Sequence, residues 1–313
     1  MTEISPPRAV TDDSRPALPG RFHVSVCVCT RNRPDELAKC IASITASELP
    51  AHEIIVSDDS DDGFAGATRA AAAGSALYTR GPRRGLCANR NNAIAQVTGD
   101  HLLFLDDDAR LARDFLSRVR ECLDSETTGD PGKTIVTGRE RRPGRALTAA
   151  REQSFLGFQE LGYDGDDRYS TVVINAAVFP RGLFTQIGFD ERLRYGYDEV
   201  DLTTRALALG YRIVARPEAV NDHFPSPVNR GEYSAVTDAS RLYVTAKRYA
   251  VTERTRLRVA AFALVAPLHL LAAAVKSSGF RGVARWGATL KLTLSHLRAG
   301  LGGATARPPL KER

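Results

Sequence analysis

Three adjacent aspartates, Asp106-Asp107-Asp108, directly follow the apolar segment HLLFL at residues 101–105. Carboxylates this close repel one another, and the loss of solvent at the end of a buried strand adds to the cost. A hard divalent cation removes the repulsion, and Mg²⁺ typically takes one or two carboxylates together with phosphate oxygens. The run therefore predicts a divalent-metal site that also holds a diphosphate.

The order of the three aspartates suggests separate roles. Side chains alternate along an extended segment, so Asp106 and Asp108 point the same way and Asp107 points the opposite way. Two carboxylates can then face the metal and diphosphate, while the third faces a sugar or a ribose. The alternative is a solvated acidic turn that caps a helix over residues 109–122, but the preceding apolar strand favours the metal site.

Other side chains with suitable chemistry follow predicted strands or begin predicted helices. A carboxylate at Asp58 or Asp59 can accept hydrogen bonds from a nucleobase or a ribose hydroxyl, although Asp is also a common turn residue. His223 offers a neutral imidazole as a third metal ligand. Asp198 and Glu199 begin a helix, where acidic residues suit either the helix dipole or a general base.

The elements that must position these residues alternate between strands and helices. We expect strands at residues 24–29, 53–57, 76–79 and 101–105, and helices at 34–46, 65–73 and 86–97. This order predicts a parallel sheet with covering helices. Ligands bind such sheets at the carboxyl ends of the strands, where the polar turns after the first, second and fourth strands all fall.

The pattern is weaker in the second half of the chain. Residues 124–169 carry several Gly and the arginines Arg139, Arg141, Arg142 and Arg145, so we expect a partly irregular connection over the site. We then expect strands at 171–179 and 211–215, helices at 181–187 and 199–209, and His223 on a loop.

Composition limits the class of protein. The chain has 313 residues and five cysteines without a CxxC pair, which favours a large domain with buried, reduced thiols over a zinc site. Residues 1–20 are polar and have no apolar signal segment, so we expect a disordered lead-in and a cytoplasmic protein.

The C-terminal part has its own character. Residues 241–313 hold 14 Lys and Arg against 2 Asp and Glu, although the net charge of the whole chain is only +6. The apolar stretch 259–275 contains Pro267 and His269 and barely reaches the length of a membrane span. Two interpretations of this segment stay open. It is either a basic element that lies on an anionic membrane surface or a helix that packs on the domain. Sparse aromatic residues argue against nucleic acid.

Five blocks, taken together and in order, resemble the family 2 glycosyltransferases of the GT-A fold. They are VSVCVCTRNRP, EIIVSDDSDD, GLCANRNNAIAQVTGDHLLFLDDD, NAAVFPRGLFTQIGFDERL and YGYDEVDL with GYRI and His223, within residues 22–227. The resemblance implies a mostly parallel mixed α/β sheet with helices on both faces. We expect a lead-in at 1–20, a GT-A catalytic domain at 21–240 and a basic helical extension at 241–313.

The resemblance also implies roles for individual residues. The nucleotide-sugar site would comprise Thr30, Arg31, Asn32, Asp58, Asp59, Arg90, Asp106 and Asp107. Asp59 is the preferred base contact among these. The metal, Mn²⁺ or Mg²⁺, would be held by Asp106, Asp108 and His223, and Asn175 would lie on the acceptor side.

The catalytic base is expected at the start of the helix near residue 199. The family usually has Glu-Asp or Asp-Asp here, with the second carboxylate as base, whereas this chain has Asp198-Glu199. Position favours Glu199, but its extra methylene leaves Asp198 open. The implied reaction is an inverting transfer of a hexosyl or deoxyhexosyl group from a UDP- or dTDP-sugar. The acceptor would be a saccharide, a lipid-linked saccharide or a small molecule.

Three other functions fit the sequence less well. A sugar-nucleotide nucleotidyltransferase needs a Gly-rich phosphate loop after the first strand, where this chain has Thr30-Arg31-Asn32-Arg33-Pro34. A HAD-type phosphatase needs its nucleophilic aspartate after the first strand, not the fourth. An inactive GT-A scaffold with a membrane-binding tail would not need to keep the aspartate run and the carboxylate pair at 198 and 199.

Overall fold

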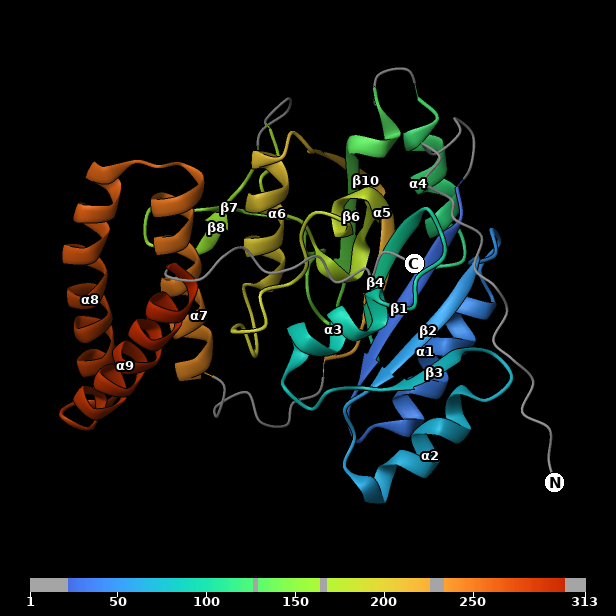
Figure 1. Cartoon of the computed structure of the whole chain (residues 1–313), viewed down its shortest axis with the longest axis horizontal. Helices are drawn as coiled ribbons and strands as arrows, with labels where there is room; N and C mark the ends of the chain where they lie inside the picture. The colour runs from blue at the N-terminus through green and yellow to red at the C-terminus, as the bar shows by residue number, and fades with distance from the viewer. Residues whose placement is uncertain (1–21, 126–128, 164–167, 226–233, 302–313) are drawn as a thin grey trace.

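A computed structural model describes residues 22–125, 129–163, 168–225 and 234–301 (Figure 1). The lead-in predicted at residues 1–20 lies outside the described residues. A central sheet runs through the molecule, and three long helices, α7 to α9, are grouped at one side of it.

The central sheet has eight strands in the order β3-β2-β1-β4-β9-β6-β10-β5. The strands are β1 (Val24–Thr30), β2 (Glu53–Asp58), β3 (Leu77–Arg80), β4 (His101–Asp106), β5 (Ala109–Arg110), β6 (Thr134–Arg141), β9 (Ala177–Pro180) and β10 (Arg212–His223). Strand β9 is antiparallel to β4 and β6, and β5 is antiparallel to β10, whereas the other pairs are parallel. The predicted mostly parallel mixed sheet is confirmed.

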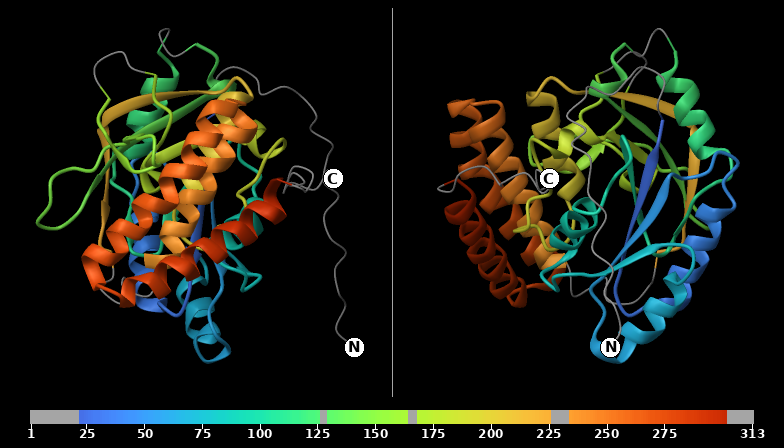
Figure 2. Two further views of the ribbon diagram at one scale, coloured as in Figure 1. Left: turned by 90° about the vertical axis from the view of Figure 1, so that its left-hand side faces the viewer. Right: turned by 45° about the vertical axis from the view of Figure 1, so that its right-hand side comes forward.

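Helices cover both faces of the sheet (Figure 2). On one face lie α1 (Pro34–Thr45), α2 (Asp62–Ala72) and α4 (Phe115–Leu123), and on the other lie α3 (Leu86–Ile94), α5 (Arg181–Phe184) and α6 (Asp198–Ala208). Strand β4 shows why both faces are needed. Leu103 and Leu105 enter the first core, and Leu102 and Phe104 enter the second, so an uninterrupted apolar run is buried on both sides.

The register of the strands brings the polar strand ends to one edge of the sheet. Thr30 pairs with Asp58 at the ends of β1 and β2, and Cys29 pairs with Asp106 at the end of β4. Further along the strand order, His223 at the end of β10 pairs with Ala109 of β5. Residues from four strands therefore meet where the sequence predicts a ligand site.

The second half of the chain differs from the sequence-based expectations in three places. Residues 124–169 contain the central strand β6, whose Ile135 and Val136 are fully buried, besides the short hairpin β7 (Glu152–Gln153) and β8 (Gln159–Leu161). The strand expected at 171–179 forms only at β9, because a 3₁₀ turn at Ile174–Ala176 (η3) precedes it. His223 lies within β10, which continues past a register shift between Ala215 and Val220.

Four helical segments form the C-terminal part: α7 (Ser234–Lys247), a π-helical turn at Arg248–Thr252 (η4), α8 (Arg256–Ser278) and α9 (Arg281–Leu301). Helix α7 is joined to α6 and to the segment before it by buried charges. Lys247 Nζ lies 2.8 Å from Asp190 and 2.6 Å from Asp201 on α6, and the Tyr243 hydroxyl donates to Asp190 at 2.7 Å. The predicted boundary at residue 240 falls inside α7, and the division into domains stays a prediction.

Within the described residues, one helix, α8, is long and apolar enough to cross a membrane, and it is mostly exposed. The five cysteines are all buried and free of disulfides, as predicted from their spacing.

Candidate functional site

Two aspartates at the end of β4 and in the turn after it, and a histidine at the end of β10, form a cluster with the spacing of metal ligands. Asp106 ends β4, Asp108 lies in the turn after it, and His223 ends β10. One ligand atom of each lies within 4.8 Å of the others. His223 Nε2 lies 3.2 Å from Asp108 Oδ1, and its Nδ1 lies 2.5 Å from the buried carboxylate of Glu140 on β6. The three predicted metal ligands are therefore brought together.

The charges of this cluster favour a cation. Burial opposes ionisation of Asp108, but hydrogen bonds from His223 and Arg33 outweigh it and lower the pKa to about 2. Burial likewise opposes protonation of His223, but its bonds to Asp108 and Glu140 raise the pKa to about 9. A positive charge is thus strongly stabilised between these carboxylates. Two carboxylates and an imidazole suit a divalent metal such as Mn²⁺, whose binding would release the proton.

Asp107 makes contacts of a different kind. It is fully buried, and its Oδ2 accepts hydrogen bonds from Thr30 Oγ1 at 2.8 Å and Arg33 Nε at 3.1 Å. Burial raises its pKa to about 7, against the opposing charge of Arg33. Arg33 also donates to Asp108 at 2.8 Å, so it bridges two carboxylates of the run. Asp107 holds the loop after β1 in place, and its predicted contact with a ribose or sugar stays a prediction.

Asp58, the last residue of β2, and Asp59, which follows it, differ in how many hydrogen bonds their carboxylates accept. Asp58 Oδ2 accepts from the Tyr78 hydroxyl at 2.7 Å and from Arg80 at 3.0 Å. Asp59 Oδ1 accepts from the backbone N–H of Arg83 at 2.9 Å, and burial raises the pKa of Asp59. The geometry therefore favours a structural role for Asp58, and the base contact predicted for Asp59 stays a prediction.

The turn after β1 is tied to the loop after β2 by Asn32. Its φ of 58° lies in the left-handed region, its N–H donates to Ser60 Oγ at 2.7 Å, and its Oδ1 accepts from the N–H of Asp61 at 2.8 Å. Arg31 is exposed and lies 3.8 Å from Asp61, so the structure does not bring it into the aspartate cluster. Nucleotide contacts by these two residues stay predictions.

Arg90 connects the aspartate cluster to the start of α6. It is buried in α3, where its Nη2 donates to Asp106 at 3.2 Å and its Nη1 donates to Asp198. A buried guanidinium is costly unless opposite charges and hydrogen bonds compensate it, and these two carboxylates do so. Its predicted contact with the nucleotide stays a prediction, but the structure shows that Arg90 orients both carboxylates.

Asn175 holds Asp106 from the other side. In the turn η3, its Oδ1 accepts from the backbone N–H of Asp106 at 2.8 Å. Its Nδ2 donates to Asp106 Oδ2 at 3.3 Å and to Glu140 Oε2 at 3.4 Å. These contacts aim the Asp106 carboxylate, and the acceptor-side role predicted for Asn175 stays a prediction.

The two carboxylates at the start of α6 lie in different surroundings. Asp198 is buried against Arg90, whereas Glu199 is partly exposed and accepts a hydrogen bond from Gln159 Nε2 at 3.3 Å. Burial, helped by the charge of Asp198, raises the pKa of Glu199 to about 7. The preceding Tyr197 has a left-handed φ of 63°, a conformation that costs free energy and recurs at functional sites. A reachable carboxylate with a pKa near neutrality suits a general base.

Sequence reasoning missed three residues of this site: Glu140, Arg33 and Gln159. The strand that carries Glu140 could have been predicted, because TIVTGRER at residues 134–141 begins with β-branched residues typical of a strand. Arg33 was seen only as part of a polar turn. Gln159 lies in a short hairpin whose sequence gives no comparable signal.

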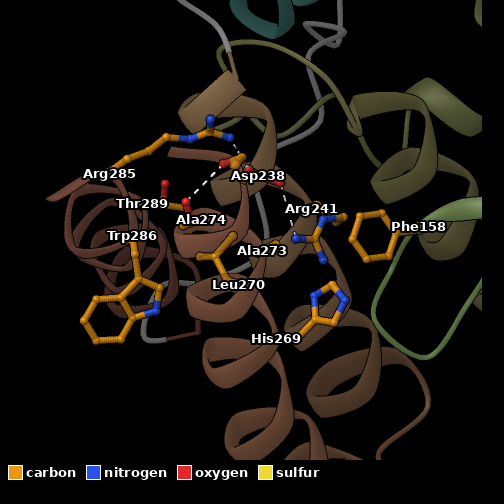
Figure 3. A pocket seen from close by; sticks show the side chains of 11 residues that line it. Phe158, Asp238, Arg241, His269, Leu270, Ala273, Ala274, Arg285, Trp286 and Thr289 are labelled. Atoms are coloured by element: carbon orange, nitrogen blue, oxygen red, sulfur yellow. Dashed lines mark hydrogen bonds and ion pairs between the residues drawn. The ribbon is translucent and has the colours of Figure 1, made fainter. Parts of the chain in front are cut away.

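One cavity adjoins the cluster. A cavity of about 330 Å³ is lined by Arg142, Pro143, Arg145, Phe224 and Pro225. Phe224 follows His223 in sequence, and Arg142 Nε donates to Glu140 at 2.6 Å. Two of the arginines expected over the site therefore line a space beside the metal cluster. Another cavity lies among α7, α8 and α9, and no residue of the cluster lines it (Figure 3).

Replacing Glu140 by Gln is expected to weaken Mn²⁺ binding by about 10–100-fold, because the buried carboxylate orients the His223 ring and raises its basicity. Titration calorimetry with Mn²⁺ measures the effect, and Glu152→Gln on β7 is the matched control. Equal affinity in Glu140→Gln and the control would show that His223 is not held in a metal site.

Comparison with known proteins links this geometry to a family. Residues 25–184 match the model described as Glycosyl transferase family 2. The succinoglycan biosynthesis protein ExoM of Rhizobium meliloti (strain 1021) is 34% identical over 115 residues, which are 34% of this chain and 36% of ExoM. The alignment thus spans about a third of that relative.

Two solved structures share the overall fold. The mannosyltransferase PcManGT from Pyrobaculum calidifontis, in complex with GDP-Man and Mn²⁺, superposes with a TM-score of 0.56 at 19% identity, over 95% of this chain and 91% of that one. S. aureus TarS 1–349, in complex with UDP-GlcNAc, superposes with a TM-score of 0.57 at 15% identity, over 88% and 81% of the two chains.

Proposed function

Because the chain belongs to glycosyl transferase family 2, we propose that it transfers a sugar from a nucleotide-diphosphate sugar to an acceptor hydroxyl, with metal dependence and inversion at the anomeric carbon. The family resemblance and the GT-A fold expected from the sequence are confirmed, and the protein is a glycosyltransferase. The donor, the metal, the stereochemistry and the residue roles are parts of the proposal.

One observation carries the proposal. The cluster of Asp106, Asp108 and His223 is joined to the start of α6 by Arg90, which contacts Asp106 on one side and Asp198, the neighbour of Glu199, on the other. A donor site and a base are therefore fixed relative to each other by buried groups. Such positioning is what a direct displacement requires.

The donor would lie along the edge formed by β1, β2 and β4. Asp59 is suited to the base or ribose, and Asp106, Asp108 and His223 would hold Mn²⁺ or Mg²⁺ beside the diphosphate. The bound cation would stabilise the charge that develops on the leaving diphosphate. Complexes of PcManGT with GDP-Man and of TarS with UDP-GlcNAc support a nucleotide-sugar donor, and we propose a UDP- or dTDP-sugar.

Glu199 would act from the opposite side of the anomeric carbon. Its carboxylate takes the proton of the acceptor hydroxyl, whose oxygen forms the new bond as the bond to the diphosphate breaks. The electron pair of the broken bond stays on the diphosphate, so no covalent enzyme intermediate forms. The acceptor is a saccharide, a lipid-linked saccharide or a small molecule, and the buried cysteine thiols support a reducing, cytoplasmic setting.

A donor panel tests the proposal. The purified chain is incubated with UDP-, dTDP- and GDP-sugars, with Mn²⁺, with Mg²⁺ or with a chelator, and nucleoside diphosphate release is measured. We expect release from at least one donor, stimulated by the metal and lost with the chelator. A chain that neither binds nor cleaves any donor with metal present would contradict the proposed function.

A further inference from the structure

The outer face of α8 is apolar over its whole length. Leu257, Leu264 and Leu268 are 85%, 68% and 60% exposed, and Ala261, Val265, Ala272 and Val275 are exposed as well. At 3.6 residues per turn these seven side chains fall within an arc of roughly 100°. Single exposed leucines need no explanation, but a continuous stripe of this length marks an interaction surface.

Phe280 extends this apolar stripe at the turn into α9. It is 96% exposed, in the connection between Ser278 and Arg281. In Figure 2, α8 and α9 form the outermost layer on one side of the molecule, with α7 behind them. We call this pair of helices with its turn, residues 256–301, the α8–α9 hairpin.

Positive charge surrounds the stripe. Between Arg254 and Leu301 the sequence holds eight Lys and Arg and not one Asp or Glu. Arg256, Lys276 and Arg281 are exposed near the ends of the stripe, and Lys291 and Arg298 are exposed along α9. An apolar stripe with basic flanks matches an anionic bilayer, whose acyl region takes the apolar side chains and whose headgroups attract the cations.

The opposite face of α8 decides between lying on a membrane and crossing it. Phe262, Ala266 and Leu270 are buried in a small core with Leu242 of α7 and Tyr249 of η4. Because one side of α8 is thus part of the protein interior, a spanning position would break up this core. The helix is long enough to span, yet its buried side favours an orientation parallel to the surface.

Polar contacts fix the hairpin to the catalytic part. Asp238 of α7 forms ion pairs with Arg285 of α9 and with Arg241 of α7 (Figure 3). Arg241 also donates a hydrogen bond to the backbone carbonyl of Leu156 at 2.6 Å. The Trp286 indole N–H donates to the carbonyl of Pro267 at 2.9 Å and so links α9 to α8. The hairpin is therefore a fixed part of the surface.

We propose that the α8–α9 hairpin docks this glycosyltransferase on an anionic lipid bilayer, with α8 parallel to the membrane surface. A second copy of the chain fits the face less well, because two hairpins without acidic residues repel each other. Nucleic acid would satisfy the cations but would leave the leucine stripe in water.

Vesicle co-sedimentation of the full chain tests the proposal. The vesicles contain either phosphatidylcholine alone or phosphatidylcholine with an equal part of phosphatidylglycerol. The stripe variant is Leu264→Ser with Leu268→Ser, and its control replaces exposed apolar residues elsewhere, Phe64→Ser with Leu77→Ser. The charge variant is Arg256→Gln, Lys276→Gln and Arg281→Gln, and its control is Arg113→Gln, Arg120→Gln and Arg181→Gln. Thermal melting checks that each variant is folded.

We expect the unchanged chain and both controls to sediment with the anionic vesicles, and alkaline carbonate to release them. The stripe and charge variants should each lose at least about tenfold in partitioning. The proposal is overturned if the unchanged chain stays in the supernatant, or if both variants bind as tightly as their controls. If the bound chain resists release by carbonate, α8 spans the membrane. If the chain does not bind vesicles and forms a dimer that the stripe variant cannot form, the stripe is covered by a second copy of the chain. Either result rejects docking parallel to the surface.

Discussion

Glu199→Gln is expected to lower the rate of sugar transfer by about 10²–10⁴-fold, the usual contribution of a general base. The amide keeps the size of the side chain and its contact with Gln159 but cannot take a proton from the acceptor. Because Glu199 does not contact the aspartate cluster through any described hydrogen bond, the dissociation constant of the donor should be unchanged. Initial rates and donor titration calorimetry separate the two quantities.

Asp198→Asn distinguishes the two carboxylates of α6. Loss of the Asp198 charge leaves Arg90 with Asp106 alone, so this change should weaken donor binding as well as transfer. Glu121→Gln, on the exposed side of α4, serves as a control for loss of a carboxylate elsewhere. Transfer at the normal rate in Glu199→Gln would exclude Glu199 as the base.

Glu199 also sets the expected pH dependence of the transfer rate. A base acts only when deprotonated, and the pKa of Glu199 is raised to about 7, so transfer should be slow below neutrality, rise with pH through about 7 and level off above it. The residual transfer by Glu199→Gln should lack this rise.

The second large effect is expected from Asp108→Asn. The change removes one of the two carboxylates of the metal cluster and the partner of His223 and Arg33. We expect weaker Mn²⁺ binding and a loss of about 10³-fold or more in kcat/KM, which corresponds to roughly 4 kcal/mol of transition-state stabilisation. Calorimetry with Mn²⁺ and initial rates over a range of metal concentrations measure both.

Excess metal provides an internal check. Asp106 and His223 remain in Asp108→Asn, so a high Mn²⁺ concentration should restore part of the rate, which a misfolded protein could not do. Asp114→Asn, at the start of α4, is the matched control. Unaltered Mn²⁺ affinity and rate in Asp108→Asn would remove the metal cluster from the mechanism.

The first half of the fold could be predicted because its signals are local. Strands β1, β2 and β4 are short apolar runs that end in polar turns, and parallel strands place such ends at one edge of a sheet. Asp107 and Asp108 lie in the turn after β4, where Arg33 contacts both carboxylates, so the alternation expected for an extended segment does not hold there.

The rest depends on contacts between distant residues. Asn175 interrupts the strand expected at 171–179, because its side chain bonds to the backbone of Asp106 and competes with the sheet ladder. Arg90 and Asp198 are 108 positions apart, so no local sequence pattern predicts that they pair. Glu140 was missed because β6 lies between segments rich in Gly and Arg, and that composition suggested a loop.

The buried bridge made by Arg90 has a consequence for how sequences related to this one can diverge. Loss of Arg90 leaves the buried Asp198 carboxylate without its partner, and loss of Asp198 leaves the buried Arg90 with Asp106 alone. Breaking a buried ion pair by removing one partner usually destabilises a protein strongly. Those two positions should therefore drift together or not at all. Glu199 lies outside the bridge, so under the proposed mechanism the length of its side chain is free to follow the acceptor. Compared with an Asp-Asp pair, the order Asp198-Glu199 is then a change of reach at one position that leaves the charge pair of Arg90 and Asp198 intact.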